Sequence, residues 1–285
     1  MTLRDALTEA STSIERRDAE VMLAHLLERD RAWLLAHPEA ELSAAQLAEF
    51  CAQVARREER EPLQYITGVQ EFFGLSLKVT PATLIPRPET EHLVEAVLAW
   101  AATQTQTKLR VLDVGTGSGA IAIALAKNLP HAEVSASDVS TAALAVARGN
   151  AERLGARVRF VESDLLVAFA EFPLFDVIAA NPPYVPDSDG AMLQREVRDF
   201  EPWVALFGGS DGLDLYRRLI PQARTALRTG GRLAMELGFG QSEALKDLLQ
   251  GWRDVRFVED YAGIPRIALA ERPPDEGTGP YDGLA

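Results

Sequence analysis

The sequence predicts an α/β protein in which helices cover a mostly parallel β-sheet, with a smaller helical part in front of it. Between residues 110 and 270, short apolar runs of strand length alternate with stretches of helix length, which is the pattern of a parallel-rich sandwich. Residues 1 to about 60 show helical periodicity and no clear strand. A chain of 285 residues with 47% hydrophobic content can bury a large core and suits two domains.

The N-terminal part, residues 1–70, is expected to be a small helical bundle. Its apolar residues recur at helical spacing, and Ser43 is a typical N-cap for a helix that reaches about Arg60. Residues 71–84 then alternate like two short strands with Gly74 near the turn. This pattern predicts a β-hairpin linker between the two domains.

The second domain is expected to span residues 85–272, and it begins with a helix that ends near Ala102. The tail, residues 273–285, is rich in Pro, Gly and acidic residues and is expected to be disordered. Strands are expected at Arg110–Val114, Glu133–Ser137, Arg157–Val161, Phe175–Ala180, Gly231–Leu237, Val255–Glu259 and Arg266–Ala270.

Composition and charge narrow the possible functions. A net charge of −13 argues against a protein that depends on phosphate contacts, because such proteins usually carry a basic face. Cys51 is the only cysteine and the four histidines are scattered, so neither an internal disulfide nor a metal site is expected. The first residues lack the apolar core of a signal peptide, and no apolar run is long enough to span a membrane. We therefore expect a cytoplasmic protein.

A glycine-rich loop, Asp113–Gly119, follows one expected strand and precedes a helical pattern. Glycine lets the backbone turn tightly and approach a ligand, and the next helix offers free N–H groups. Asp138 ends the following strand about 20 residues past the glycines, where an acidic residue meets ribose hydroxyls in such folds. Together they predict a cofactor that carries adenosine, whereas a glycine loop alone is also typical of a plain strand-to-helix turn.

The tetrapeptide Asn181-Pro182-Pro183-Tyr184 follows a buried strand and therefore lies where open α/β sheets build their sites. The Asn181 side-chain carbonyl and the Pro182 carbonyl are two acceptors that suit a planar –NH2 group, and Tyr184 offers that group a flat wall. The simpler alternative is a turn, since Asn-Pro and Pro-Pro occur in many loops. Combined with the glycine loop, the tetrapeptide predicts a site that grips an amide or aromatic amine.

These motifs resemble those of class I S-adenosylmethionine-dependent methyltransferases that act on planar amino groups. Further segments resemble the peptide chain release factor glutamine methyltransferase family, also called PrmC or HemK, and the resemblance runs from about residue 15 to about residue 270. It implies a Rossmann-like class I methyltransferase sandwich whose last strand is antiparallel, with S-adenosyl-L-methionine as cofactor and S-adenosyl-L-homocysteine as product. The segments are Glu61–Gly68, Thr83–Glu91, Glu201–Pro202, Ala205–Leu206 and Gly208–Gly209.

The resemblance also implies roles for individual residues. Asp164 matches the family's acidic position near adenine, although an N-cap is an equally good interpretation, and Leu165 stands where members often carry an aromatic residue. The expected catalytic residues are Asn181, Pro182, Pro183 and Tyr184. The expected cofactor-binding residues are Gly115, Thr116, Gly117, Ser118, Gly119, Asp138, Asp164, Leu165 and Asn181.

The expected reaction is methyl transfer to the glutamine side chain in the Gly-Gly-Gln loop of peptide chain release factors. The helical bundle would recognise this protein substrate, with no stable nucleic-acid or membrane partner. A nucleic-acid adenine methyltransferase is the alternative, because an adenine amino group meets the same acceptors, but the acidic charge balance counts against it. A binding protein that has lost activity is a third, disfavoured by the intact Asn181 and glycine loop. No general base is apparent, so the proton released after transfer would go to water.

Overall fold

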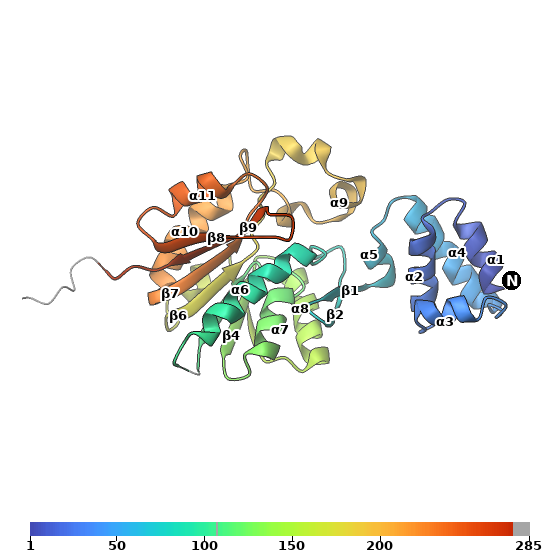
Figure 1. Cartoon of the computed structure of the whole chain (residues 1–285), viewed down its shortest axis with the longest axis horizontal. Helices are drawn as coiled ribbons and strands as arrows, with labels where there is room; N and C mark the ends of the chain where they lie inside the picture. Colours follow the sequence, from blue (N-terminus) through green and yellow to red (C-terminus); the bar gives the residue numbers. More distant parts are fainter. Residues whose placement is uncertain (107, 276–285) are drawn as a thin grey trace, which may run out of the picture.

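The computed structural model describes residues 1–106 and 108–275 (Figure 1). Most of the tail for which disorder was expected, residues 276–285, lies outside the described residues. In the described part, no helix is both long enough and apolar enough to cross a membrane.

The N-terminal helices pack around an apolar core of their own, in which Met22, Leu23 and Phe50 are almost completely buried. Two of the helices begin with a capping box, at Thr2 and at Ser43, so the expected start of the long helix is confirmed. The helices are α1 (Leu3–Ala10), α2 (Arg16–Leu26), α3 (Arg31–Ala36), α4 (Ala44–Glu58) and α5 (Leu63–Thr67).

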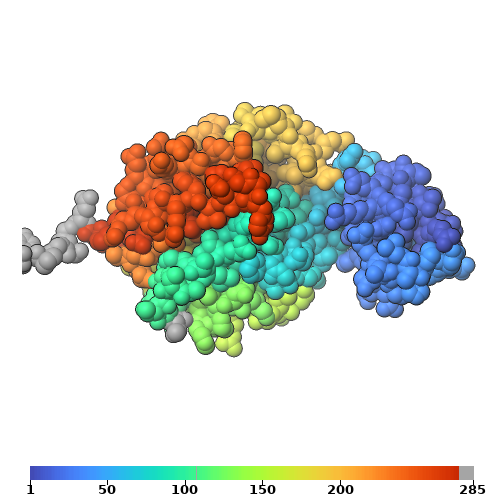
Figure 2. All heavy atoms as spheres, in the orientation of Figure 1, coloured from blue at the N-terminus to red at the C-terminus, as the bar shows by residue number. Residues whose placement is uncertain are grey.

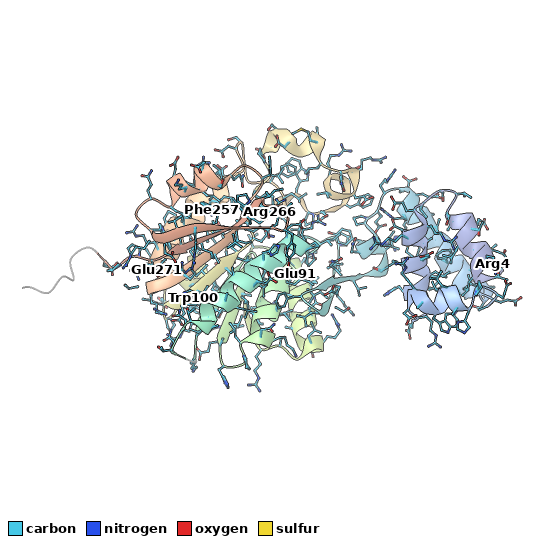
Figure 3. The ribbon with its side chains drawn as sticks, in the orientation of Figure 1. Arg4, Glu91, Trp100, Phe257, Arg266 and Glu271 are labelled. Atoms are coloured by element: carbon cyan, nitrogen blue, oxygen red, sulfur yellow. The ribbon has the colours of Figure 1, made fainter. Side chains whose placement is uncertain are left out.

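A two-stranded hairpin, β1 (Val69–Phe72) and β2 (Leu75–Lys78), joins this bundle to the rest of the chain (Figure 1). Phe73 and Gly74 both have positive φ, as in the two-residue turns that match the twist of a hairpin. The turn is anchored to the second domain because Glu91, labelled in Figure 3 at the start of α6, accepts a 2.8 Å hydrogen bond from the Phe73 N–H.

A seven-stranded sheet forms the centre of the second domain, in the order β5-β4-β3-β6-β7-β9-β8. The first five strands in this order are parallel, and β9 is antiparallel to both of its neighbours. This confirms the expected fold class and the antiparallel last strand. The strands are β3 (Arg110–Val114), β4 (Glu133–Asp138), β5 (Val158–Glu162), β6 (Phe175–Ala180), β7 (Leu227–Glu236), β8 (Arg253–Glu259) and β9 (Pro265–Glu271).

Helices cover both faces of the sheet, so the strands are buried on both sides (Figure 1). In β6, Val177 packs into the core under α6, α7 and α8, while the next residue, Ile178, packs into the opposite core under α10 and α11. This alternation explains why β6 is an almost unbroken apolar run. The helices are α6 (Glu91–Ala102), α7 (Ala120–Asn128), α8 (Thr141–Leu154), α10 (Asp214–Ala226) and α11 (Ser242–Leu248).

A long connection between β6 and α10 contains a short helix that the sequence did not predict, α9 (Arg195–Phe200). In Figure 1 this connection is the yellow segment above the end of the sheet, and in Figure 2 its yellow atoms reach toward the blue helical bundle. The two parts meet there, because Arg57 of α4 forms a 2.8 Å ion pair with Glu196 of α9. Arg57 also pairs with Asp18 of α2 at 2.7 Å, so one guanidinium links two bundle helices to the second domain.

Candidate functional site

The glycine loop and the Asn-Pro-Pro-Tyr loop lie side by side at one edge of the sheet. They follow β3 and β6, which are neighbouring parallel strands paired from Val111↔Val177 to Val114↔Ala180. The chain runs from β3 to β4 on one side and returns to β6 on the other, so these strands flank the topological switch point. Ligands of open α/β sheets bind at this position.

The glycine loop is built on positive φ angles and on the carboxylate of Asp138. Gly115, Gly117 and Gly119 have φ of 73°, 55° and 85°, which side-chain-bearing residues rarely adopt. Asp138 accepts hydrogen bonds from the Gly117 N–H at 2.8 Å and, through its other oxygen, from the Ser140 N–H at 2.9 Å. Since each carboxylate oxygen can accept a further bond, Asp138 shapes the loop and keeps acceptor capacity for a ligand.

Asp113, at the end of β3, holds the same loop from beneath. Its Oδ2 accepts from the Thr116 hydroxyl at 2.6 Å and from the Ala122 N–H at 3.1 Å, which ties the loop to the start of α7. Complete burial raises the pKa of Asp113 to about 7. This structural role of Asp113 was not foreseen.

A cavity of about 460 Å³ opens over both loops. Most of the expected cofactor residues line it: Gly115, Thr116, Gly117, Ser118, Asp138, Asp164, Leu165 and Asn181. Gly119 lies behind the loop, where a Cβ atom would come within 2.9 Å of Ile123 and 3.2 Å of Ala147. Pro183 lines the cavity, whereas Pro182 and Tyr184 are not among the described residues that do.

Asp164 and Leu165 lie together on the cavity wall after β5. The Asp164 carboxylate forms a 2.5 Å ion pair with Arg218 of α10, and both side chains are about half exposed. Leu165 has a φ of 53°, an unusual value for a leucine, and presents an apolar surface to the cavity. The structure therefore offers apolar packing at the position where the family often carries an aromatic ring.

The Asn181 side chain is held by hydrogen bonds to residues that the sequence did not single out. Its Nδ2 donates to the Thr90 hydroxyl at 3.1 Å, and that hydroxyl donates to Glu236 Oε2 at 2.6 Å. The Tyr184 hydroxyl lies 3.4 Å from the other oxygen of Glu236. Burial raises the pKa of Glu236 to about 7. The Tyr184 hydroxyl thus faces the buried side of the loop.

Glycines fix the backbone of the Asn-Pro-Pro-Tyr loop from outside. A Cβ atom at Gly208 would lie 2.5 Å from the Pro183 carbonyl oxygen, and one at Gly212 would lie 2.2 Å from that of Tyr184. Gln241, at the start of α11, donates to the same Tyr184 carbonyl at 3.0 Å. The loop is therefore held in one conformation by close backbone contacts, which explains the paired glycines that follow Leu206.

Two of the segments that carry the family resemblance meet at the cavity. Glu201 is buried, accepts a 3.2 Å hydrogen bond from the Ile85 N–H, and forms a short ion pair with Arg87. This contact joins the wall before α6, residues 82–86, to the wall after α9, residues 202–207, and both walls line the cavity. The sequence could not predict the contact of Glu201 with Arg87, because the two residues lie far apart in the chain. The contact between Thr90 and Glu236 could not be predicted for the same reason.

Comparison with protein-family models finds two matches. The PrmC N-terminal domain matches residues 2–68, which include all five bundle helices. The methyltransferase small domain matches residues 93–198, which include the glycine loop, Asp138 and the Asn-Pro-Pro-Tyr loop.

Among solved structures, the chain resembles the 16S rRNA methyltransferase RsmC of T. thermophilus with a TM-score of 0.54 and 21% identity over 72% of this chain and 49% of that one. A methyltransferase from Pyrococcus furiosus gives a TM-score of 0.52 and 20% identity over 81% of this chain and 100% of that one. Both likenesses show the fold of methyltransferases.

Curated relatives match nearly the whole chain. A release factor glutamine methyltransferase from Koribacter versatilis is 45% identical over 96% of this chain and 99% of its own length. The protein of that name from Escherichia coli is 41% identical over 94% of this chain and 96% of its own. Both the helical bundle and the domain with the cavity are covered by these matches, and the chain belongs to the release factor glutamine methyltransferase family.

Proposed function

We propose that this protein transfers a methyl group from S-adenosylmethionine to the side-chain amide nitrogen of the glutamine in the Gly-Gly-Gln loop of peptide chain release factors. The observation that carries the proposal is the hydrogen bonding of the Asn181 side chain. Its Nδ2 is occupied by Thr90, while its Oδ1 receives no hydrogen bond from the described residues and the side chain lines the cavity. That oxygen is an acceptor ready for an incoming –NH2 group.

The cavity suits the proposed cofactor. Its glycine-loop side offers backbone N–H groups at the start of α7, and Asp138 keeps acceptor capacity for ribose hydroxyls. Leu165 and the neighbouring apolar wall of the cavity suit a flat base. The Asp164 carboxylate, which is paired with Arg218, lies on the same part of the cavity wall. The RsmC structure is a complex with AdoMet and guanosine, which supports the same cofactor for this fold. When bound, S-adenosylmethionine supplies an activated methyl group on a positively charged sulfur.

The protein's contribution to the chemistry is orientation. A glutamine amide nitrogen is a weak nucleophile because its lone pair is delocalised into the carbonyl. Asn181 Oδ1 and the Pro182 carbonyl would accept its two N–H groups, aim the nitrogen at the methyl carbon and stabilise the positive charge that develops on it. S-adenosylmethionine, when bound, would supply the methyl group and keep the electron pair of the broken C–S bond on its sulfur, and one proton would leave the amide nitrogen for water. Such orientation is worth several kcal/mol.

The helical bundle, residues 1–70, is proposed to recognise the release factor. An isolated glutamine offers too little surface to be selected, so binding energy from remote contacts must position it. The bundle has its own core and reaches the catalytic domain through the hairpin and the Arg57–Glu196 pair. Because release factors act on ribosomes, we expect the protein to work in the cytoplasm.

This role of the bundle predicts that a protein lacking residues 1–70 binds S-adenosylmethionine normally but methylates release factor poorly. A short Gly-Gly-Gln peptide is the control substrate, because it cannot use remote contacts and should react equally slowly with both proteins. A truncated protein that methylates release factor at the full-length rate would exclude the bundle as the recognition element.

The catalytic assignment is tested with Asn181→Ala, using cofactor labelled on the methyl group and either release factor or DNA as acceptor. We expect the wild-type protein to transfer label to release factor and not to DNA. The Asn181→Ala variant should lose methyl transfer while it keeps its affinity for S-adenosylmethionine. Asn181→Asp should be less damaged because a carboxylate still accepts N–H bonds. Near-normal turnover by the alanine variant would refute the role of Asn181, and label in DNA alone would favour the adenine methyltransferase.

A further inference from the structure

A buried chain of hydrogen bonds lies behind Asn181 and crosses three segments of the second domain. It runs from Asn181 Nδ2 to the Thr90 hydroxyl at 3.1 Å, and from that hydroxyl to Glu236 Oε2 at 2.6 Å. Thr90 is 4% exposed and precedes α6, and Glu236 is 2% exposed and ends β7. Burying a carboxylate is costly, so its presence here calls for a function.

The charge on Glu236 is not balanced by an ion pair within the described chain. Arg266, labelled in Figure 3 at the start of β9, lies near it but is paired with Asp260 at 2.9 Å. Glu89 also lies near and opposes the charge. The contacts that Glu236 makes through its side chain are instead with the hydroxyls of Thr90 and Tyr184. The carboxylate is therefore placed to accept hydrogen bonds from the Thr90 and Tyr184 hydroxyl groups.

This arrangement determines which way the Asn181 amide faces. A threonine hydroxyl can donate one hydrogen bond, and that of Thr90 donates to Glu236. Only the lone pairs of the Thr90 oxygen therefore remain for Asn181. Those lone pairs attract the Nδ2–H of Asn181 and repel its Oδ1. If the amide were rotated by half a turn, Oδ1 would face a lone pair and the –NH2 group would face the substrate. Two donors would then oppose each other, and the amide clamp would fail.

We propose that Thr90 and Glu236 are positioning residues that keep Asn181 Oδ1 directed at the substrate amide. The inference rests on the proposed function, because it assumes that Asn181 accepts from the glutamine –NH2 group. Neither residue needs to touch the reacting nitrogen. Both act through the orientation of Asn181, and Tyr184 contributes by donating to the second oxygen of Glu236.

Protonation of Glu236 should weaken this control. The carboxyl group could then donate to the Thr90 oxygen, and the Thr90 proton would be free to turn toward Asn181 Oδ1. Burial brings the pKa of Glu236 to about 7, with Glu89 raising it and Arg266 and the two hydroxyl contacts lowering it. Tyr216 also lies close, with its hydroxyl donating to the Glu236 backbone carbonyl at 2.7 Å. Turnover should accordingly decline as the pH falls below about 7.

The experiment compares Thr90→Val, which keeps the side-chain shape without the hydroxyl, with Thr90→Ser, which keeps the hydroxyl. Methylation of release factor is measured as kcat and KM, and S-adenosylmethionine affinity is measured by calorimetry. We expect Thr90→Val to lower kcat about tenfold, the effect of one lost hydrogen bond, with little change in cofactor affinity. Thr90→Ser should recover most of the activity. Thr103→Val, at the other end of α6, removes an exposed hydroxyl bonded to a backbone carbonyl and serves as the matched control.

A double substitution separates positioning from general stability. If Thr90 acts only through the orientation of the Asn181 amide, Thr90→Val should lower kcat little further once Asn181→Asp is present, because a carboxylate presents an oxygen to the substrate in either orientation. A purely structural role would give the same loss in both backgrounds. Glu236→Gln should lower kcat at pH 8 and remove the decline below pH 7. The inference is overturned if Thr90→Val keeps kcat within about twofold of wild type or if the two substitutions act additively. The proposed function itself would fail separately, if the wild-type protein did not methylate release factor at all.

Discussion

Asn150 of α8 connects the hairpin linker to the glycine loop, and replacing it with alanine should weaken both. Its Nδ2 donates to the carbonyl oxygens of Lys78, in β2, and Ser118, in the glycine loop, each at 2.9 Å. Its Oδ1 accepts from the Lys78 N–H at 2.8 Å and from Arg153 at 3.1 Å. The side chain is completely buried, so Asn150→Ala leaves these partners without an immediate replacement.

The size of the effect follows from the partners. Three of the four bonds join Asn150 to backbone groups, and each is worth about 1 kcal/mol net. The fourth partner, Arg153, is an exposed side chain that water can solvate, so its loss contributes little. Asn150→Ala should therefore lower the free energy of unfolding by about 3 kcal/mol. Asn150→Asp should be no better, because its second oxygen would face two carbonyls.

The assay is urea unfolding followed by circular dichroism, with S-adenosylmethionine affinity measured in parallel. Asn128→Ala is the matched control, since Asn128 makes one hydrogen bond, to the Ala124 carbonyl at 2.8 Å, near the end of α7. The control should lose less than about 1 kcal/mol. If Asn150→Ala unfolds within about 1 kcal/mol of wild type, the link between hairpin and glycine loop does not carry the stability we assign to it.

Three further predictions concern the site. Asp138→Ala should weaken S-adenosylmethionine binding by about 1.5–3 kcal/mol, because a charged acceptor is lost, and calorimetry that shows unchanged affinity would exclude the ribose role. Gly119→Ala should destabilise the fold and weaken cofactor binding, since φ is 85° and Ile123 blocks the Cβ atom, and thermal unfolding measures this directly. Burial raises the pKa of Asp113 and of Glu236 to about 7, so the folded state favours their protonated forms. Stability should fall as the pH rises from about 4, where both groups titrate in the unfolded chain, to about 7, where they titrate in the folded protein, and Glu236→Gln should reduce that slope in denaturant titrations.

The parts of the fold that depend on neighbouring residues in sequence could be predicted. The run from Phe175 to Ala180 is largely apolar because both sheet faces are covered, and the capping box at Ser43 is contained within four residues. The helix α9 could not be predicted, because it is short and none of its residues is buried. Its place is instead fixed by contacts such as the ion pair between Glu196 and Arg57.

The candidate site shows the same division. The glycine loop and Asn181 could be recognised because each belongs to a motif of consecutive residues. Glu236 was hidden, since a carboxylate at the end of a strand is usually solvated, and its partner Thr90 lies 146 residues away. The wall that Tyr184 is expected to offer the substrate stays a prediction, and its hydroxyl lies 3.4 Å from Glu236, a contact that the sequence did not suggest. The pairing of β6 with β7 brings the Asn-Pro-Pro-Tyr loop close to Glu236, and the start of α6 adds Thr90 from a third segment.

The glycines around the Asn-Pro-Pro-Tyr loop also limit how the enzyme could be redesigned. At Gly208, Gly209 and Gly212 a single added carbon would collide with backbone or with Asp214, so mutant libraries should find almost no tolerated substitution there. The preceding wall is different, because Trp203 and Val204 are about 60% exposed, and Val204 lines the cavity. A directed-evolution search for enzymes that accept another amide or amine would therefore gain most from varying these exposed wall positions, while leaving the glycines intact.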